Sequence, residues 1–238
     1  MLLHDIAATS TCLSQTLSSH FFLLFFPLYS ALMDAIAAAG YKEPSPIQRA
    51  SLPVGLSNRD IIGVAETGSG KTAAFLLPLL CYVMRQPKLT AVTSQDGPYA
   101  IVMAPARELA QQIHEEAEKF GKYVGVRSVC VVGGQSVHDQ AARMSLGAEV
   151  IIATPGRLFD LLQQRLLVLN QCNYIVLDEA DRMLDMGFEP QIQAVMDSMP
   201  ATNMRPLEDT SNSGAKHYRQ TIMFSATMPF KVEQLAKK

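Results

Sequence analysis

Four residues in two separate segments have the side chains that a nucleotide-hydrolysing site needs. Lys71 carries a positive charge that suits the outer phosphates of a nucleotide, and the hydroxyl of Thr72 can ligate Mg²⁺. Asp178 can hold the same metal ion from the opposite side, and Glu179 can orient or activate a water molecule. We therefore interpret Lys71, Asp178 and Glu179 as catalytic residues, and Thr72 and Asp178 as Mg²⁺ ligands, partly through water.

A glycine-containing segment forms the first half of this candidate site. Gly68 and Gly70 allow the backbone to curl so that its amides can face phosphate oxygens. The usual motif begins with Gly and this one begins with Ala65, but the other positions match. A strand is expected before the loop, at residues 60–64, and a helix after it, over about residues 71–85. The residues expected to contact the nucleotide here are Ala65, Glu66, Thr67, Gly68, Ser69, Gly70, Lys71 and Thr72.

The acidic segment that forms the second half of this candidate site can be interpreted only together with the residues before it. Asp178-Glu179-Ala180-Asp181 alone is more often a solvated helix start than a metal site. The apolar run Tyr174–Leu177 that precedes it predicts a buried parallel strand. Such a strand places its next residue at the carboxyl edge of the sheet, where open α/β folds bind their ligands. We therefore expect the acidic segment and the phosphate loop to meet around one bound nucleotide.

Composition limits the class of protein to which the chain can belong. Its 238 residues, 48% of them hydrophobic, suffice for one large α/β domain with a sizeable core, while two full domains would be cramped. The net charge of −2 provides no general basic field, so any nucleic-acid contact must be local. The four cysteines and five histidines have no metal-ligand spacing. This predicts no structural metal and a reducing, intracellular setting.

The first 28 residues differ from the rest of the chain. They contain no Lys or Arg, and their apolar run Phe21–Phe26 is too short to span a bilayer as a helix. A signal peptide would need a positively charged start and a small-residue cleavage site. We expect residues 1–28 to be an extension that is disordered or outside the fold, with a targeting signal as the alternative and no attachment to a membrane.

From residue 29 onward, helical and extended patterns alternate. An amphipathic helix is expected over residues 107–122, with Ile113 and Phe120 on its apolar stripe. The polar residues 200–219 have no apolar period and predict an insertion loop. The pattern as a whole predicts an α/β P-loop NTPase domain over residues 29–238, with a mostly parallel sheet covered by helices on both faces in three layers. Strands are expected at residues 60–64, 100–103, 128–132, 150–153, 174–177 and 221–224.

Five further segments match, in order, the motifs of one family. With them the chain resembles the DEAD-box ATP-dependent RNA helicases, whose core domains are RecA-like, over nearly everything after residue 28. Within that family it is similar to the pre-mRNA-splicing helicase associated with the tri-snRNP, on the basis of Glu66 and residues 182–190 and 218–221. The five segments are Gly40–Gln48, Pro105–Ala110, Gly133–Gly134, Thr154–Leu158 and Ser225–Thr227.

The resemblance implies ATP, with Mg²⁺, as the bound nucleotide. Gln48 carries a carboxamide that can pair with N6 and N7 of adenine, and Tyr41 and Pro46 stand beside it. Without those neighbours, Gln48 would be interpreted as a surface residue at a helix start. The chain departs from the family at Leu23, where an aromatic residue usually covers the adenine, and at Ala106, where Thr is commoner.

The resemblance also implies a path for RNA. Arginine side chains and helix N-termini suit phosphate groups and read no base edges, which predicts sequence-independent binding of single-stranded or locally unwound RNA. Alone, Arg107 could merely begin a helix and Gly133-Gly134 could merely form a turn. Ser225 and Thr227 are expected to bond Asp181 and so couple the ATP site to RNA. The implied RNA-binding residues are Pro105, Arg107, Gly133, Gly134, Thr154, Gly156 and Arg157.

Family members bind ATP and RNA between two RecA-like domains, and this chain ends at Lys238, shortly after its last motif. We therefore expect the second domain to be absent and the isolated chain to be weakly active or inactive. Spliceosomal protein partners and a nuclear location follow from the resemblance alone. Two alternatives remain open, namely a P-loop ATPase that acts on DNA or protein and a non-catalytic nucleotide-binding module.

Overall fold

The computed structural model describes residues 30–200 and 218–236. The expectations for residues 1–28, including Leu23, and for most of the loop 200–219 fall outside the described residues. None of the helices in the described ranges is long and apolar enough to cross a membrane. The elements are α2 (Ser30–Ala38), α3 (Pro46–Leu56), β1 (Ile61–Val64), α4 (Lys71–Met84), η3 (Thr93–Asp96), β2 (Ala100–Met103), α5 (Arg107–Val124), β3 (Ser128–Val131), α6 (Val137–Ser145), β4 (Val150–Ala153), α7 (Pro155–Gln163), β5 (Tyr174–Leu177), α8 (Ala180–Asp185), α9 (Glu189–Asp197), β6 (Gln220–Ser225) and α10 (Phe230–Ala236).

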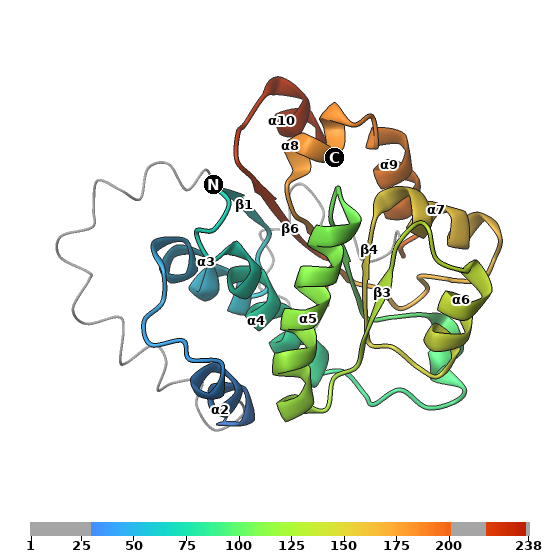
Figure 1. Cartoon of the computed structure of the whole chain (residues 1–238), viewed down its shortest axis with the longest axis horizontal. Coiled ribbons are helices and arrows are strands. Elements are labelled where there is room, and N and C mark those ends of the chain that lie inside the picture. The colour runs from blue at the N-terminus through green and yellow to red at the C-terminus, as the bar shows by residue number, and fades with distance from the viewer. Residues whose placement is uncertain (1–29, 201–217, 237–238) are drawn as a thin grey trace.

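Six strands form one sheet in the order β1-β6-β5-β2-β4-β3, and Figure 1 shows β1 and β6 towards one side of the molecule and β4 and β3 towards the other. Every neighbouring pair is parallel, so the sheet is wholly parallel where the sequence predicted it mostly parallel. Every residue of β2, β4 and β5 is buried, which is why these strands read as continuous apolar runs. Because all strands point the same way, their six carboxyl ends share one edge, where ligands of such sheets bind.

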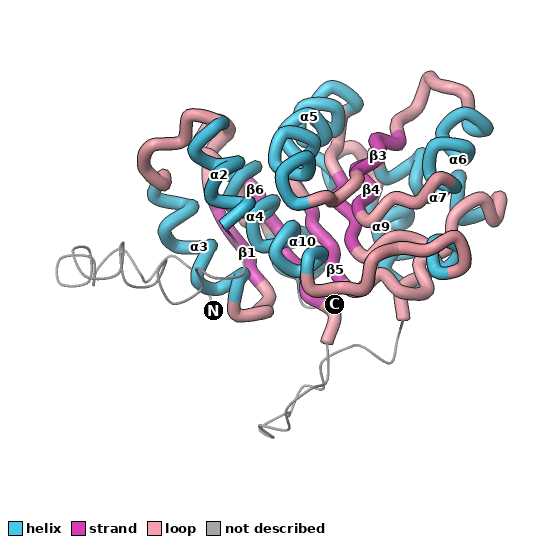
Figure 2. The backbone as a smooth tube through the Cα atoms, turned by 90° about the horizontal axis from the view of Figure 1, so that it is seen from below, coloured by secondary structure: helices cyan, strands magenta, loops and turns pink. Residues whose placement is uncertain are grey.

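Each strand contributes alternate residues to two hydrophobic clusters, one on either face of the sheet. On β2, Ala100 and Val102 pack in the cluster that includes residues of α2 to α5, whereas Ile101 and Met103 pack in the cluster that includes residues of α6 to α10. Figure 2 shows the strands running between helices on both sides. A slip of one residue would exchange the two faces, so this two-sided burial fixes the register of the sheet.

Most expected elements agree with the structure to within about two residues. β1 starts at Ile61 and β3 ends at Val131, each one residue inside its expected range, while β6 is longer than expected. α5 begins at Arg107 as expected and continues past Gly121 to Val124, and it ends at Gly125, which has φ of 68° and adopts the left-handed conformation.

Candidate nucleotide site and nucleic-acid interface

The carboxyl edge of the sheet has two halves. The residues that follow β1 and β5 include those predicted to bind the nucleotide, the residues at the end of β6 are those predicted to couple it to RNA, and the residues that follow β2, β4 and β3 are those predicted to bind RNA. Backbone hydrogen bonds continue beyond the strands, since Ala65 N donates to Ser225 O at 3.0 Å and Asp178 N donates to Met103 O at 2.9 Å. The second bond joins β5 to β2, where the two halves meet.

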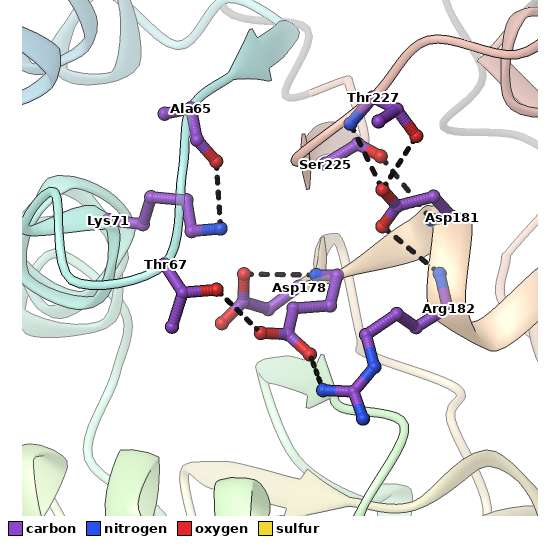
Figure 3. Close-up of polar contacts among 9 residues, drawn as sticks. Ala65, Thr67, Lys71, Asp178, Asp181, Arg182, Ser225 and Thr227 are labelled. Carbon is purple, nitrogen blue, oxygen red and sulfur yellow. Dashed lines mark hydrogen bonds and ion pairs between the residues drawn. The ribbon is translucent and has the colours of Figure 1, made fainter.

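The phosphate loop curls around the ammonium group of Lys71. Gly68 and Gly70 have φ of 82° and 92°, values that L side chains rarely adopt, so the loop requires glycine at both positions. Lys71 is buried, and its Nζ donates to the carbonyl of Ala65 at 3.0 Å (Figure 3). Thr72 follows in the first turn of α4. A positive charge and the amino end of a helix thus lie at the same end of the loop, as anion binding needs.

Gln48 at the start of α3 is hydrogen-bonded to the phosphate loop. Its Nε2 donates to Gly70 O at 2.9 Å, and its Oε1 accepts from Ser45 N at 2.9 Å. A carboxamide has two amide hydrogens and two acceptor positions, so one of each is left for a ligand. Pro46 is the first residue of α3, and Tyr41 packs against Phe120 of α5 with the ring centroids 6.0 Å apart.

The acidic segment meets the phosphate loop at the end of β5. Glu179 has φ of 54° and ψ of 50°, a left-handed conformation that is uncommon outside glycine and that places it between β5 and α8. Its Oε1 accepts from Thr67 Oγ1 at 3.4 Å, and its own backbone N donates to Asp178 Oδ1 at 3.0 Å. The two predicted halves of the site therefore converge in space.

Asp178 is only 2% exposed. Burial, opposed by the charge of Lys71 and aided by the charge of Glu179, raises the pKa of its carboxyl to about 6. A carboxyl with a pKa near 6 is half protonated at pH 6 and mostly ionised at pH 7. A bound divalent cation would favour the ionised form.

Asp181 links the acidic segment to the end of β6. Its Oδ2 accepts from the backbone N of Thr227 at 3.0 Å and from Thr227 Oγ1 at 2.9 Å, and its backbone N donates to Ser225 Oγ at 3.3 Å (Figure 3). The contacts expected for Ser225 and Thr227 are thus present. Burial raises the pKa of Asp181, but the hydrogen bonds from Thr227 and Arg182 outweigh it and leave the pKa lowered.

On the other half of the edge, the side chain of Arg107 lies against Gly133 and Gly134. A Cβ atom on Gly134 would lie 2.3 Å from Arg107 Nη1, and one on Gly133 would lie 3.2 Å from Nη2. Real Cβ atoms essentially never approach to the first distance and rarely to the second, so the two glycines allow the guanidinium to rest on the backbone. The structure therefore brings together three RNA-binding candidates, Arg107 and the two glycines, which lie about a helix and a strand apart in the sequence.

Arg157 joins the same surface from α7. Its Nη2 donates to the carbonyl of Gln135 at 3.1 Å. The fully buried Gln140 holds this loop from α6, because its Nε2 donates to Val132 O at 2.8 Å and to Gln135 Oε1 at 3.3 Å. Sequence reasoning missed Gln135 and Gln140, since an isolated glutamine gives no periodic or motif signal.

The remaining RNA-binding candidates lie at the ends of β2 and β4. Pro105 is buried between β2 and α5, and Thr154 immediately precedes α7. Gly156 lies in the first turn of α7. Thr154 and Gly156 are therefore at the amino end of a helix, where phosphate is favoured.

Comparisons with known proteins agree with this arrangement. A protein named "DEAD-box ATP-dependent RNA helicase 21" from Oryza sativa subsp. japonica is 59% identical over 212 residues, which are 89% of this chain and 29% of the relative. "Pre-mRNA-splicing ATP-dependent RNA helicase PRP28" from Yarrowia lipolytica is 55% identical over 209 residues, 86% of this chain and 36% of the relative. The chain thus spans little more than a third, at most, of the length of these two relatives.

A solved structure is similar as well. The crystal structure of the RNA helicase Prp28 from Chaetomium thermophilum, bound to ADP, has 48% sequence identity and a TM-score of 0.72, and the likeness covers 87% of this chain and 45% of that one. The sheet is accordingly that of a RecA-like helicase domain. The family model described as "DEAD/DEAH box helicase" matches residues 45–235. With the phosphate loop, the acidic segment and the edge residues all inside the matched range, the chain belongs to the DEAD/DEAH box helicase family.

Proposed function

We propose that this chain is the ATP-binding and RNA-binding half of an RNA helicase that couples ATP hydrolysis to local remodelling of RNA duplexes. The observation that carries the proposal is the convergence of Thr67 and Lys71 with Asp178 and Glu179 at one end of a sheet edge whose other end presents Arg107. A site of this kind combines the charges that phosphoryl transfer needs with a surface for a phosphate backbone.

In the proposed reaction, Lys71 binds the outer phosphates and Glu179 orients the attacking water. Thr72 and Asp178 would hold Mg²⁺, which when bound neutralises charge on the phosphate oxygens. Both groups are oxygen donors, which Mg²⁺ prefers. Within residues 30–200 and 218–236, no three His, Cys, Asp or Glu side chains are arranged to hold a metal ion by themselves. The site therefore fits an ion that takes most of its ligands from the nucleotide and water.

Adenine selection is assigned to Gln48. Its free amide hydrogen and free acceptor position match N7 and N6 of adenine, whereas guanine presents O6 instead of an amino group. Because the same side chain bonds Gly70 O, base binding would be sensed directly by the phosphate loop.

The RNA contact is assigned to the edge over β2, β4 and β3. Arg107 and Arg157 supply fork-shaped donors for phosphates, and Gly156 lets a backbone approach closely. None of these groups reads a base edge, so we expect binding that is independent of sequence and weakened by salt. Asp181, Ser225 and Thr227 would couple the two halves of the edge.

The role in the cell is inferred from the relatives. A relative from Yarrowia lipolytica is named a pre-mRNA-splicing helicase, which supports a nuclear role in splicing with spliceosomal proteins as partners. The relatives are much longer than this chain, which supports a requirement for a second RecA-like domain for full activity.

The decisive experiment measures ATP hydrolysis by the chain alone and by a fusion that carries, after Lys238, the segment that follows the matched region in the rice relative. Single-stranded RNA, single-stranded DNA of the same sequence, and no nucleic acid are compared. We expect the fusion to be faster than the chain alone and to be stimulated by RNA more than by DNA. Equal stimulation by DNA would indicate a different class of P-loop ATPase, and nucleotide binding without hydrolysis in the fusion would indicate a non-catalytic module.

A further inference from the structure

Arg182 in the first turn of α8 makes the shortest contact with the carboxylate of Glu179. Its Nη1 donates to Glu179 Oε2 at 2.7 Å, while Thr67 Oγ1 reaches Oε1 at 3.4 Å from the other side. The side chain of Glu179 is 8% exposed, and the side chain of Arg182 is 63% exposed. A buried carboxylate is therefore held between a loop hydroxyl and a cation that reaches in from the surface.

The local charges explain why Glu179 needs a cation of its own. Asp178 is buried next to Glu179 in the chain, so two carboxyl groups lie side by side at the end of β5. Lys71 acts on Asp178 and donates to Ala65 O. Arg182 is the cation that forms an ion pair with Glu179.

We propose that Arg182 is a positioning residue for the hydrolysis reaction, holding the Glu179 carboxylate in one orientation so that it can accept a hydrogen bond from the attacking water. Each carboxylate oxygen has about two acceptor positions, so Oε1 and Oε2 both keep one after bonding Thr67 and Arg182. The inference deepens the proposed function and rests on it, because it assumes that Glu179 acts on water.

An ion pair with the same spacing elsewhere provides a matched control. Lys119 and Glu116 on α5 also pair at i and i+3, but there the side chain of Glu116 is 27% exposed, and its further neighbour is Tyr41 and not the acidic segment. Exposed helix pairs of this kind contribute little to stability. If the Arg182–Glu179 pair were simply another ion pair of this kind, Arg182→Ala and Lys119→Ala would have the same effect on the hydrolysis rate.

The test measures single-turnover ATP hydrolysis with protein in excess, and binding of a fluorescent ATP analogue, for wild type, Arg182→Ala, Arg182→Lys, Glu179→Gln, the Arg182→Ala/Glu179→Gln double variant and Lys119→Ala. Arg182→Gln, which keeps a polar side chain and the methylene groups nearest the backbone without the charge, replaces Arg182→Ala if thermal unfolding shows that the alanine variant does not fold. Both the chain and the fusion described above are assayed.

We expect Arg182→Ala to lower the hydrolysis rate about 10- to 100-fold, as misplacement of a reacting group does, with nucleotide affinity unchanged. Arg182→Lys should recover part of the rate, Lys119→Ala should match wild type, and the double variant should be no slower than Glu179→Gln. A wild-type rate in Arg182→Ala, or a further loss in the double variant, would overturn the inference while leaving the proposed function intact. Equal rates for wild type and Glu179→Gln in the fusion would overturn the proposed function, and the inference with it.

Discussion

The hydroxyl of Thr67 lies 3.4 Å from Oε1 of Glu179, although 112 residues separate them in the sequence. The contact exists because Thr67 follows β1 and Glu179 follows β5, and only β6 lies between these two strands in the sheet. It brings the residue that we assign to the attacking water next to the loop that we assign to the phosphates. The predictions that follow test this arrangement and its neighbours.

Replacing Glu179 with Gln should remove hydrolysis and keep nucleotide binding. Glutamine has nearly the same shape, so the loop contact can persist, but an amide is a poorer acceptor for the water proton than a carboxylate. We expect the single-turnover rate to fall about 10²- to 10⁴-fold, the usual contribution of a positioned base. Glu118→Gln on α5, where the side chain of Glu118 is 53% exposed, is the control for loss of an acidic charge. Parallel loss of binding and hydrolysis would show that Glu179 has a structural role.

Asp178 should make the nucleotide-free protein less stable as pH rises through the acid range. The pKa of its carboxyl is raised by burial to about 6 from 3.8, so the folded state binds the proton more tightly than the unfolded state between these values. Asp178→Asn should therefore be more stable than wild type above pH 6, by up to about 3 kcal/mol at about 1.4 kcal/mol for each pKa unit, and the difference should shrink towards pH 4.

Urea unfolding at several pH values, with EDTA and without nucleotide, measures this difference. Asp96→Asn is the matched control, because Asp96 is exposed in η3 and the substitution should leave the pH dependence unchanged. A stability difference between Asp178→Asn and wild type that does not vary with pH would contradict the assigned pKa shift.

Gly134→Ala should weaken RNA binding more than backbone strain alone can explain. The new Cβ would lie 2.3 Å from Arg107 Nη1, so the guanidinium must move. Gly125→Ala is a close control, since Gly125 also has positive φ but has open space around its Cβ position. Both variants should lose about 1–2 kcal/mol of stability from the left-handed backbone, and only Gly134→Ala should bind RNA more weakly in fluorescence anisotropy titrations. Equal RNA affinity in the two variants would remove Arg107 from the proposed RNA surface.

Removing the hydroxyl groups that contact Asp181 should reduce the response of ATP hydrolysis to RNA. In Ser225→Ala/Thr227→Val, the backbone N–H of Thr227 still bonds Asp181, but two hydroxyl contacts are lost. The bond from Thr227 Oγ1 to the charged carboxylate contributes about 1.5–3 kcal/mol, and the bond from the backbone N of Asp181 to Ser225 Oγ about 1 kcal/mol, so the position of α8 relative to β6 should become less defined. The ratio of ATPase rates with and without RNA, measured in the fusion, should fall towards one. Ser225→Thr/Thr227→Ser retains both hydroxyls and should retain the ratio; a ratio unaffected in the first variant would exclude this route of coupling.

The sequence predicted the strands and the convergence of Lys71 with Asp178 because both follow from local pattern. Apolar runs mark buried parallel strands, and parallel strands bring their following residues to one edge. The pairing of Arg182 with Glu179 has the spacing of neighbours on a helix, but Glu179 lies just before α8 in a left-handed conformation, so the spacing alone does not predict the pair.

Other features depend on contacts that no local pattern encodes. The bond from Gln48 to Gly70 O and the position of Arg107 over Gly134 arise where separate elements pack together. The hydrogen bond from Gln140 to the carbonyl of Val132 is equally hard to predict, because every residue has a backbone carbonyl and the sequence does not show which of them is the partner. Sequence reasoning could identify Gln48 and Arg107 as candidates but could not give their partners.

The position of β6 in the sheet has a consequence for synthesis of the protein. In the described part of the sheet, β1 pairs with β6 alone, and β6 is the last strand to be made. A chain emerging from the ribosome therefore carries the phosphate loop on an unpaired strand until residues 220–225 are translated. The nucleotide site can therefore assemble only near the end of translation of this domain. Nascent chains that stop before residue 220 should gain no protection from proteases when ATP is added.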